Sequence, residues 1–175
     1  MYVILEDNEV KQVGHLYTLF PNTSNPTHEF ALENGALEVV EGEQKDQRFY
    51  WVTFDSYQVS DVVTRTYVNT PKALEDVTQL PEGSVETPEG QTEPVTTKGL
   101  KSQWIAQMKA TANSLLAETD WAVTRKMERN VNIPTNIAAK RAAIIAECTR
   151  LETALTIAPN MEAFINVIES ANWSE

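Results

Sequence analysis

A stretch rich in proline and glycine divides this chain and restricts its fold more than any other feature. Three prolines and three glycines fall between Gln79 and Gly99. They argue against a long helix or a central strand there, because proline lacks an amide donor and glycine favours turns. Few apolar side chains are available to offset the entropy lost on ordering the stretch. We therefore predict an acidic linker over residues 76–99, between a β-rich module of residues 1–75 and a helical module of residues 100–175.

The charge of the chain is unequally distributed. Residues 1–97 hold 17 acidic and 5 basic side chains, a net charge of −12, whereas residues 98–175 hold 8 and 9, a net charge of +1; the whole chain carries −11. This asymmetry supports two modules. A strongly acidic chain lacks the clustered basic face that binds phosphates, so we expect no nucleic-acid partner. An acidic surface suits basic protein partners instead.

Residues 1–75 show the pattern of a small antiparallel β module. Asp7 and Asn8 form a turn pair between two runs of apolar and alternating residues, which predicts a β-hairpin. Pro71 closes the β-rich region. β-Branched and aromatic side chains are concentrated in three further runs, which we predict to be strands: residues 36–40, 48–54 and 56–68.

Between the hairpin and the later strands, Pro21 and Pro26 predict a rigid loop. Thr27 is a typical N-cap for a short helix that Asn34 and Gly35 would end in a left-handed conformation. The alternative is that Asn34 and Gly35 form a hairpin turn, for which the pair is also typical. The sequence alone leaves both readings open.

From residue 100 onward the spacing of apolar residues becomes three to four, which predicts helices. The predicted fold class is therefore α+β, with an N-terminal antiparallel β module, a Pro/Gly-rich acidic linker and a C-terminal α-helical bundle or hairpin. We expect four helices: residues 100–117, residues 121–130 after a cap at Thr119 or Asp120, a third capped by Thr135 that ends near Ile157, and a last short one capped by Asn160.

The segment from Leu115 to Pro134 contains a tryptophan, two acidic residues close before it and three basic residues after it. It has the composition of a catalytic cluster, of a nucleic-acid contact, or of the joint between two helices. We favour the joint, with Asp120 as a cap and Trp121 packed in the core where the helices meet. Arg125, Lys126 and Arg129 would then lie on the solvent side and near the carboxyl end of the helix, where positive charge is favoured.

Residues that commonly perform catalysis or bind metals are not arranged for either role. His15 and His28 lie 13 positions apart without a further ligand at metal-site spacing. Cys148 falls on the apolar side of its predicted helix, which is typical of a small core residue. The sequence contains neither a nucleophile-elbow serine motif nor a phosphate-binding glycine loop. We therefore predict a protein that is not an enzyme and that has no catalytic residues, cofactor or metal.

Two features favour an interaction role instead. The third helix carries a heptad-like apolar track, which could pair within one chain or between two copies. The proline-containing loop could present polar residues to a partner, or it could simply be a rigid connection. The candidate partner-binding residues are Pro21, Asn22, Thr23, Ser24, Trp121, Arg125, Ile144, Leu151 and Leu155.

Two passages resemble a family of bacteriophage proteins. The passage LYTLFPNTSNPTHEFALENGALEVV, residues 16–40, resembles the opening of short tailed-phage proteins encoded near tail-fibre genes. The passage NSLLAETDWAVTRKMERNVNIPTNIAAKRAAI, which starts at residue 113, resembles a segment of the caudoviral tail fibre assembly proteins and related virion proteins. Together they cover about half of the chain, and LLAETDW is the more distinctive element. The matching positions are Pro21, Asn22, Thr23 and Ser24, and Leu115, Leu116, Thr119, Asp120, Trp121, Arg125 and Arg141.

The resemblance implies a non-enzymatic virion structural protein of the tail. It would bind the tail fibre or the baseplate and mediate fibre attachment or assembly, and it would localise to the virion tail after synthesis in the host cytoplasm. The alternative is a transient tail fibre assembly chaperone that is absent from the mature virion. Here the region after the TDW element is a longer, more apolar helix, NIAAKRAAIIAECTRLETAL. That departure favours a lasting contact, including a possible homo-oligomer, over a chaperone. Neither a signal peptide nor a membrane span is expected from the sequence.

Overall fold

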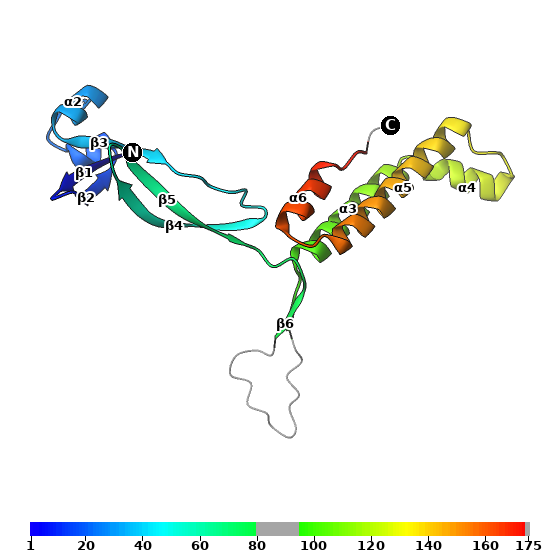
Figure 1. Cartoon of the computed structure of the whole chain (residues 1–175). Helices are drawn as coiled ribbons and strands as arrows, with labels where there is room; N and C mark the ends of the chain where they lie inside the picture. Colours follow the sequence, from blue (N-terminus) through cyan, green and yellow to red (C-terminus); the bar gives the residue numbers. More distant parts are fainter. Residues whose placement is uncertain (80–94, 174–175) are drawn as a thin grey trace, which may run out of the picture. The chain divides into compact units, whose positions relative to one another are not determined.

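The computed structural model describes residues 1–79 and 95–173 and shows a mixed α+β protein with an N-terminal β-sheet and C-terminal helices (Figure 1). The chain divides into two compact units, Met1–Pro71 and Lys72–Glu175. Most of the predicted linker lies outside the described residues.

The first unit contains a five-stranded sheet with the strand order β2-β1-β3-β5-β4. The predicted hairpin is confirmed, because β1 and β2 pair antiparallel on either side of Asp7 and Asn8. These two residues have φ angles of 54° and 64°, the left-handed conformation that a tight two-residue hairpin turn requires. The strands are β1 (Tyr2–Glu6), β2 (Glu9–Gly14), β3 (Ala36–Glu41), β4 (Tyr50–Val59) and β5 (Val63–Pro71).

The prediction of a purely antiparallel sheet is wrong at one pairing, because β3 and β5 run parallel. β4 and β5 form a hairpin, and β3 pairs with the second strand of that hairpin rather than with the first. This pairing allows Val39 of β3 and Val63 of β5 to lie side by side and to bury together with Val3 of β1. The local pattern of each strand predicts its conformation but does not reveal which neighbour completes the core.

Two short helices connect β2 to β3. The first, α1 (Leu16–Leu19), is a single turn that the sequence did not predict, and it has no side-chain cap. The second, α2 (His28–Glu33), is the predicted helix, and the Thr27 hydroxyl caps it by accepting a hydrogen bond from the Phe30 amide at 3.2 Å. Gly35 follows with a φ of 77°. Asn34 and Gly35 therefore end a helix, and the alternative hairpin turn is wrong.

The second unit begins before the predicted linker and not after it. The short strands β6 (Val77–Gln79) and β7 (Val95–Thr97) pair antiparallel with each other. Both ends of the Pro/Gly-rich stretch therefore belong to one unit. This differs from our expectation of a spacer between modules, because a composition rich in proline and glycine does not show where its two flanks pair.

Four helices follow in the described residues, and each bound that the sequence predicted agrees to within one residue: α3 (Leu100–Ala117), α4 (Asp120–Arg129), α5 (Thr135–Ile157) and α6 (Met161–Glu169), whose end was not predicted. The amides of Leu100 and Lys101, at the start of α3, donate to the carbonyl oxygens of Ala73 and Leu74 at 2.9 and 3.0 Å. These bonds satisfy donors that a helix amino terminus otherwise leaves free. Thr135 is the first residue of α5 and not its cap, which is Pro134.

The core of the second unit is built around α5, which packs against both α3 and α6; the three helices are seen in Figure 1. α3 and α5 run antiparallel, and Lys109 of α3 pairs with Glu152 of α5 at 2.6 Å. Leu151 and Leu155 of α5 are fully buried, as is Phe164 of α6. Burial of these large apolar side chains is the main stabilising contribution to such a helical unit.

The residues that directly follow α6 are held against α5. The Asn160 side chain caps α6 as predicted, accepting from the Ala163 amide at 2.9 Å. After α6, the amide of Asn172 donates to Glu147 of α5 at 2.9 Å. The hydrogen bonds from the Arg150 guanidinium hold the pKa of the Glu147 carboxyl below its usual range, because they favour the charged form.

Candidate partner-binding surface

The LLAETDW element forms the joint between α3 and α4, as the sequence predicted. Arg141 of α5 holds this joint. Its Nη1 atom lies 2.8 Å from the Leu116 carbonyl oxygen, 2.8 Å from the Thr119 hydroxyl and 2.9 Å from an Asp120 carboxylate oxygen. The Arg141 side chain is only 18% exposed, and hydrogen bonds that involve a charged group are stronger than neutral ones. The start of α4 is therefore fixed relative to α5.

Two details of the predicted joint are wrong. Neither Thr119 nor Asp120 caps α4 through its side chain, because the Thr119 hydroxyl donates back to the Leu116 carbonyl oxygen and Asp120 pairs with Arg141. Trp121 is not a core residue; it is 52% exposed, and its neighbour Ala122 is buried instead. Consecutive residues of a helix point about 100° apart. The side of α4 that is buried at Ala122 therefore does not include the indole of Trp121.

One exposed face of α4 therefore carries Trp121 and Arg125, which lie four residues apart and are neighbours on the helix surface. Arg125 makes no ion pair within the described part of the chain. In contrast, Lys126 is engaged at the end of the helix, with its Nζ atom 2.7 Å from the Asn132 amide oxygen. Tryptophan and arginine are the residue types most enriched where protein partners bind strongly. This face is the first candidate partner-binding surface.

The loop around Pro21 lies in the other unit and is held on both sides. Tyr17 of α1 donates its hydroxyl to the Asn25 side chain at 3.0 Å, and the rings of Phe20 and Phe30 pack edge to face at 5.3 Å. Pro21, Asn22 and Ser24 are exposed and Thr23 is half-buried. The loop is therefore held by contacts on both sides, which either predicted role requires, and it is accessible, which only the partner-binding role requires.

Ile144, Leu151 and Leu155 are buried inside the second unit and do not line a surface. The heptad-like track of α5 faces α3 and α6 of the same chain, so the assignment of these three residues to a partner interface is wrong. The spacing of apolar residues shows that a helix face is buried, but it does not show whether the covering helix comes from the same chain.

A group of polar and aromatic side chains lies on β3, β4 and β5, and the sequence did not predict it. The Tyr67 hydroxyl donates to Glu41, and this bond raises the pKa of Tyr67. The Arg65 guanidinium lies over the rings of Phe54 and Tyr67, 5.2 and 5.4 Å from their centres. Cation–π contacts of this kind stabilise the packing of a sheet surface. These side chains come from three different strands, so no local sequence pattern could indicate that they lie close together in space.

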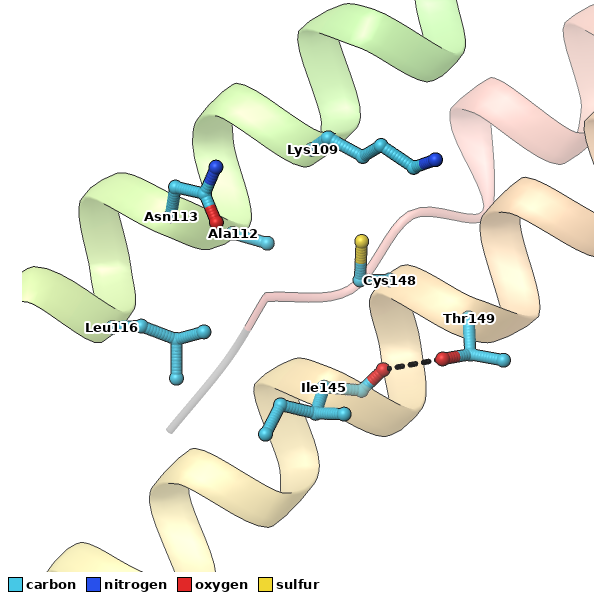
Figure 2. A pocket seen from close by; sticks show the side chains of 7 residues that line it. All are labelled: Lys109, Ala112, Asn113, Leu116, Ile145, Cys148 and Thr149. Atoms are coloured by element: carbon cyan, nitrogen blue, oxygen red, sulfur yellow. Dashed lines mark hydrogen bonds between the residues drawn. The ribbon is translucent and has the colours of Figure 1, made fainter.

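A groove with both apolar and polar lining residues runs between α3 and α5 and has a volume of about 210 Å³ (Figure 2). Cys148 lies in it, half-buried, with its side chain between the two helices. Cys148 is therefore not the buried core residue that the sequence predicted, because it is half-buried and lines a groove. The groove is lined by Lys109, Ala112, Asn113, Leu116, Ile145, Cys148 and Thr149.

Among the described residues, no three or more histidine, cysteine or acidic side chains are grouped in a way that could hold a metal ion. No described helix is both long enough and apolar enough to cross a lipid bilayer. Comparisons with protein-family models, curated proteins and solved structures give no match to this chain.

Replacing Arg141 by alanine should lower the free energy of unfolding by about 2 kcal/mol, because a mostly buried, charge-assisted set of bonds to the joint is lost. Lysine at this position should recover only part of the loss, since it lacks the planar guanidinium. Urea titration followed by circular dichroism measures both effects. The control is Arg129→Ala at the exposed end of α4, expected to change stability by less than about 0.5 kcal/mol. Equal effects at the two arginines would contradict the role of Arg141.

Proposed function

We propose that this protein is a non-enzymatic, tail-associated structural protein of a bacteriophage that binds the tail fibre or the baseplate and mediates fibre attachment or assembly. The observation that carries the proposal is the exposed pair of Trp121 and Arg125 on α4, held in place by Arg141. These three residues belong to the segment that resembles the tail fibre assembly proteins. The resemblance supplies the class of partner, and the exposed pair supplies a means of binding it.

A partner that covers the exposed face of α4 would gain binding free energy. Covering a half-exposed indole removes a large apolar area from water. Arg125 offers several hydrogen-bond donors to a carboxylate of the partner. Because Arg141 already fixes the start of α4, less conformational entropy is lost when a partner binds. A fixed helix with an exposed Trp and Arg is suited to a lasting contact.

The proposal extends to the rest of the chain. The loop Pro21–Ser24 of the first unit is a second contact for the same assembly, and the acidic residues 76–99 favour approach to a basic partner surface. In the proposed assembly, the helical unit presents α4 to the tail fibre or baseplate protein. The finished protein resides in the virion tail after its synthesis in the host cytoplasm.

The second candidate is a transient tail fibre assembly chaperone that leaves before the virion matures. It is favoured by the same resemblance. Mass spectrometry of purified virions separates the two candidates, because a structural component is present in stoichiometric copies and a chaperone is absent.

Trp121→Ala should weaken binding to the tail fibre or baseplate protein of the same phage by about 30-fold or more, the loss of roughly 2 kcal/mol that defines a binding hot spot. The stability of the protein should fall by less than about 1 kcal/mol because the indole is exposed. Isothermal titration calorimetry with each purified fibre and baseplate protein measures the first quantity, and urea titration the second.

The control for this experiment is Met127→Ala, since Met127 is an apolar residue of the same helix that is 81% exposed and points away from the Trp121 side. It should leave binding unchanged. Absence of binding to every fibre and baseplate protein would overturn the proposed function. Equal losses from the two substitutions would instead remove Trp121 from the site.

A further inference from the structure

Asn34 and Gly35 form the one Asn-Gly pair of the sequence. In such a pair the backbone nitrogen of the glycine can attack the side-chain amide carbon of the asparagine, because glycine has no side chain that obstructs the approach. Two groups held close together in one chain react much faster than the same groups free in solution. Both residues are exposed, and the space beside the Gly35 Cα is open. Water and base therefore reach this pair.

The folded conformation keeps the two reacting groups apart. Asn34 has φ and ψ angles of −96° and 19°. A ψ angle near zero places the nitrogen of the next residue beside the residue's own nitrogen and away from its side chain. The Gly35 amide also donates to the Leu32 carbonyl oxygen at 3.1 Å, and the Asn34 side-chain nitrogen donates to the Phe30 carbonyl oxygen at 2.8 Å. Attack therefore requires these hydrogen bonds to break and the ψ angle of Asn34 to rotate.

This rotation depends on the opening of α2. The helix has only six residues, and a helix that short is stable only through its caps and tertiary contacts. It is held by the Thr27 cap, by the burial of Ala31 and by the packing of the Phe30 ring. On the other side of Gly35, Ala36 is fully buried at the start of β3. The end of α2 is therefore the part that must move.

We propose that Asn34 is a site of spontaneous deamidation whose rate is set by the opening of α2. In the open state the Gly35 nitrogen forms a bond to the side-chain carbonyl carbon of Asn34 and loses its proton to base. The bond from that carbon to the side-chain nitrogen breaks, and the nitrogen leaves as ammonia after it takes a proton from water. Water then opens the cyclic imide at one of its two carbonyl carbons, which yields aspartate or isoaspartate. The proposal goes beyond the proposed function, because this reaction needs no protein partner.

The product cannot restore the closed end of the helix. A carboxylate has no proton to donate to the Phe30 carbonyl oxygen, and its negative charge lies at the carboxyl end of α2, where the helix dipole disfavours it. Isoaspartate also lengthens the backbone between α2 and β3. Phe30 packs against Phe20, which directly precedes Pro21. We therefore expect the reaction to loosen the loop of Pro21–Ser24 as well.

Peptide mapping by mass spectrometry tests the proposal. The full-length chain is incubated at mildly alkaline pH, and aspartate and isoaspartate at position 34 are measured over time. In denaturing guanidinium chloride the reaction should be at least about tenfold faster than in the folded chain, because every molecule is then open. Thr27→Ala should speed the reaction of the folded chain about fivefold, the change in the opening equilibrium expected when a helix cap is lost. In guanidinium chloride this variant should react at the wild-type rate.

The matched control is Thr53→Ala, which removes an exposed threonine of β4 in the same unit. It should react at the wild-type rate in the folded chain, and circular dichroism should show that both variants are folded before incubation. Three results would overturn the proposal. The first is a folded wild-type chain that reacts as fast as the denatured one. The second is a folded Thr27→Ala chain that reacts no faster than Thr53→Ala. The third is a denatured chain in which Asn34 reacts no faster than the other asparagines.

Discussion

Leu151→Ala should lower the free energy of unfolding by about 2 to 5 kcal/mol, the range measured when a large aliphatic core residue is truncated. Leu151 is completely buried in α5. Removing most of its side chain loses apolar burial and leaves a cavity that the surrounding helices can only partly fill. Urea titration followed by far-ultraviolet circular dichroism would measure the change.

The control for this prediction is Ile157→Ala on the same helix, because Ile157 is an aliphatic residue of the same size at an exposed position. Its loss should cost less than about 1 kcal/mol. If both substitutions destabilise the protein equally, Leu151 is not part of a tightly packed core. The packing of α3, α5 and α6 described above would then be wrong.

Gly99→Ala should destabilise the second unit by about 3 kcal/mol, at the upper end of the usual range for overpacking. Gly99 precedes α3 and lies directly against the backbone of Leu74 and Glu75; an added Cβ would be 2.5 Å from the Leu74 carbonyl oxygen. The Gly99 amide also donates to the Asp76 carboxylate at 2.8 Å. Two backbone segments that approach this closely leave no room for any side chain.

A second glycine provides the comparison. Gly35 has a φ of 77° but open space around it, so Gly35→Ala should cost only the conformational penalty of about 1 to 2 kcal/mol. Thermal unfolding followed at 222 nm would report the loss of helix for each variant. A Gly99→Ala protein as stable as the wild type would show that the backbone contact at the start of α3 is absent.

Local chemistry made several elements predictable from the sequence. The turn at Asp7 and Asn8 was correctly predicted because these residue types tolerate the left-handed conformation. The caps at Thr27 and Asn160 were correct because a short polar side chain before an apolar run satisfies a free helix amide. The helix bounds followed from proline positions and apolar spacing. In each case the cause lies within a few residues of the effect.

Features that depend on distant residues were not predictable in the same way. The parallel pairing of β3 with β5 depends on which strand completes the core. The exposure of Trp121 depends on the rotation of α4, which buries Ala122 instead. The role of Arg141 at the joint is set by the antiparallel packing of α5 against α3. Only the resemblance drew attention to this arginine, and it gave no geometry.

The pairing of β6 with β7 has a practical consequence for engineering the protein. Gln79 and Val95 are held opposite each other, so a segment inserted between them starts and ends at neighbouring points of the second unit. Doubling the length of a flexible insert whose ends are held in this way costs only about 0.6 kcal/mol. An affinity tag or a fluorescent reporter could therefore be inserted between these two positions as an internal handle, leaving both chain termini and the α4 surface unmodified.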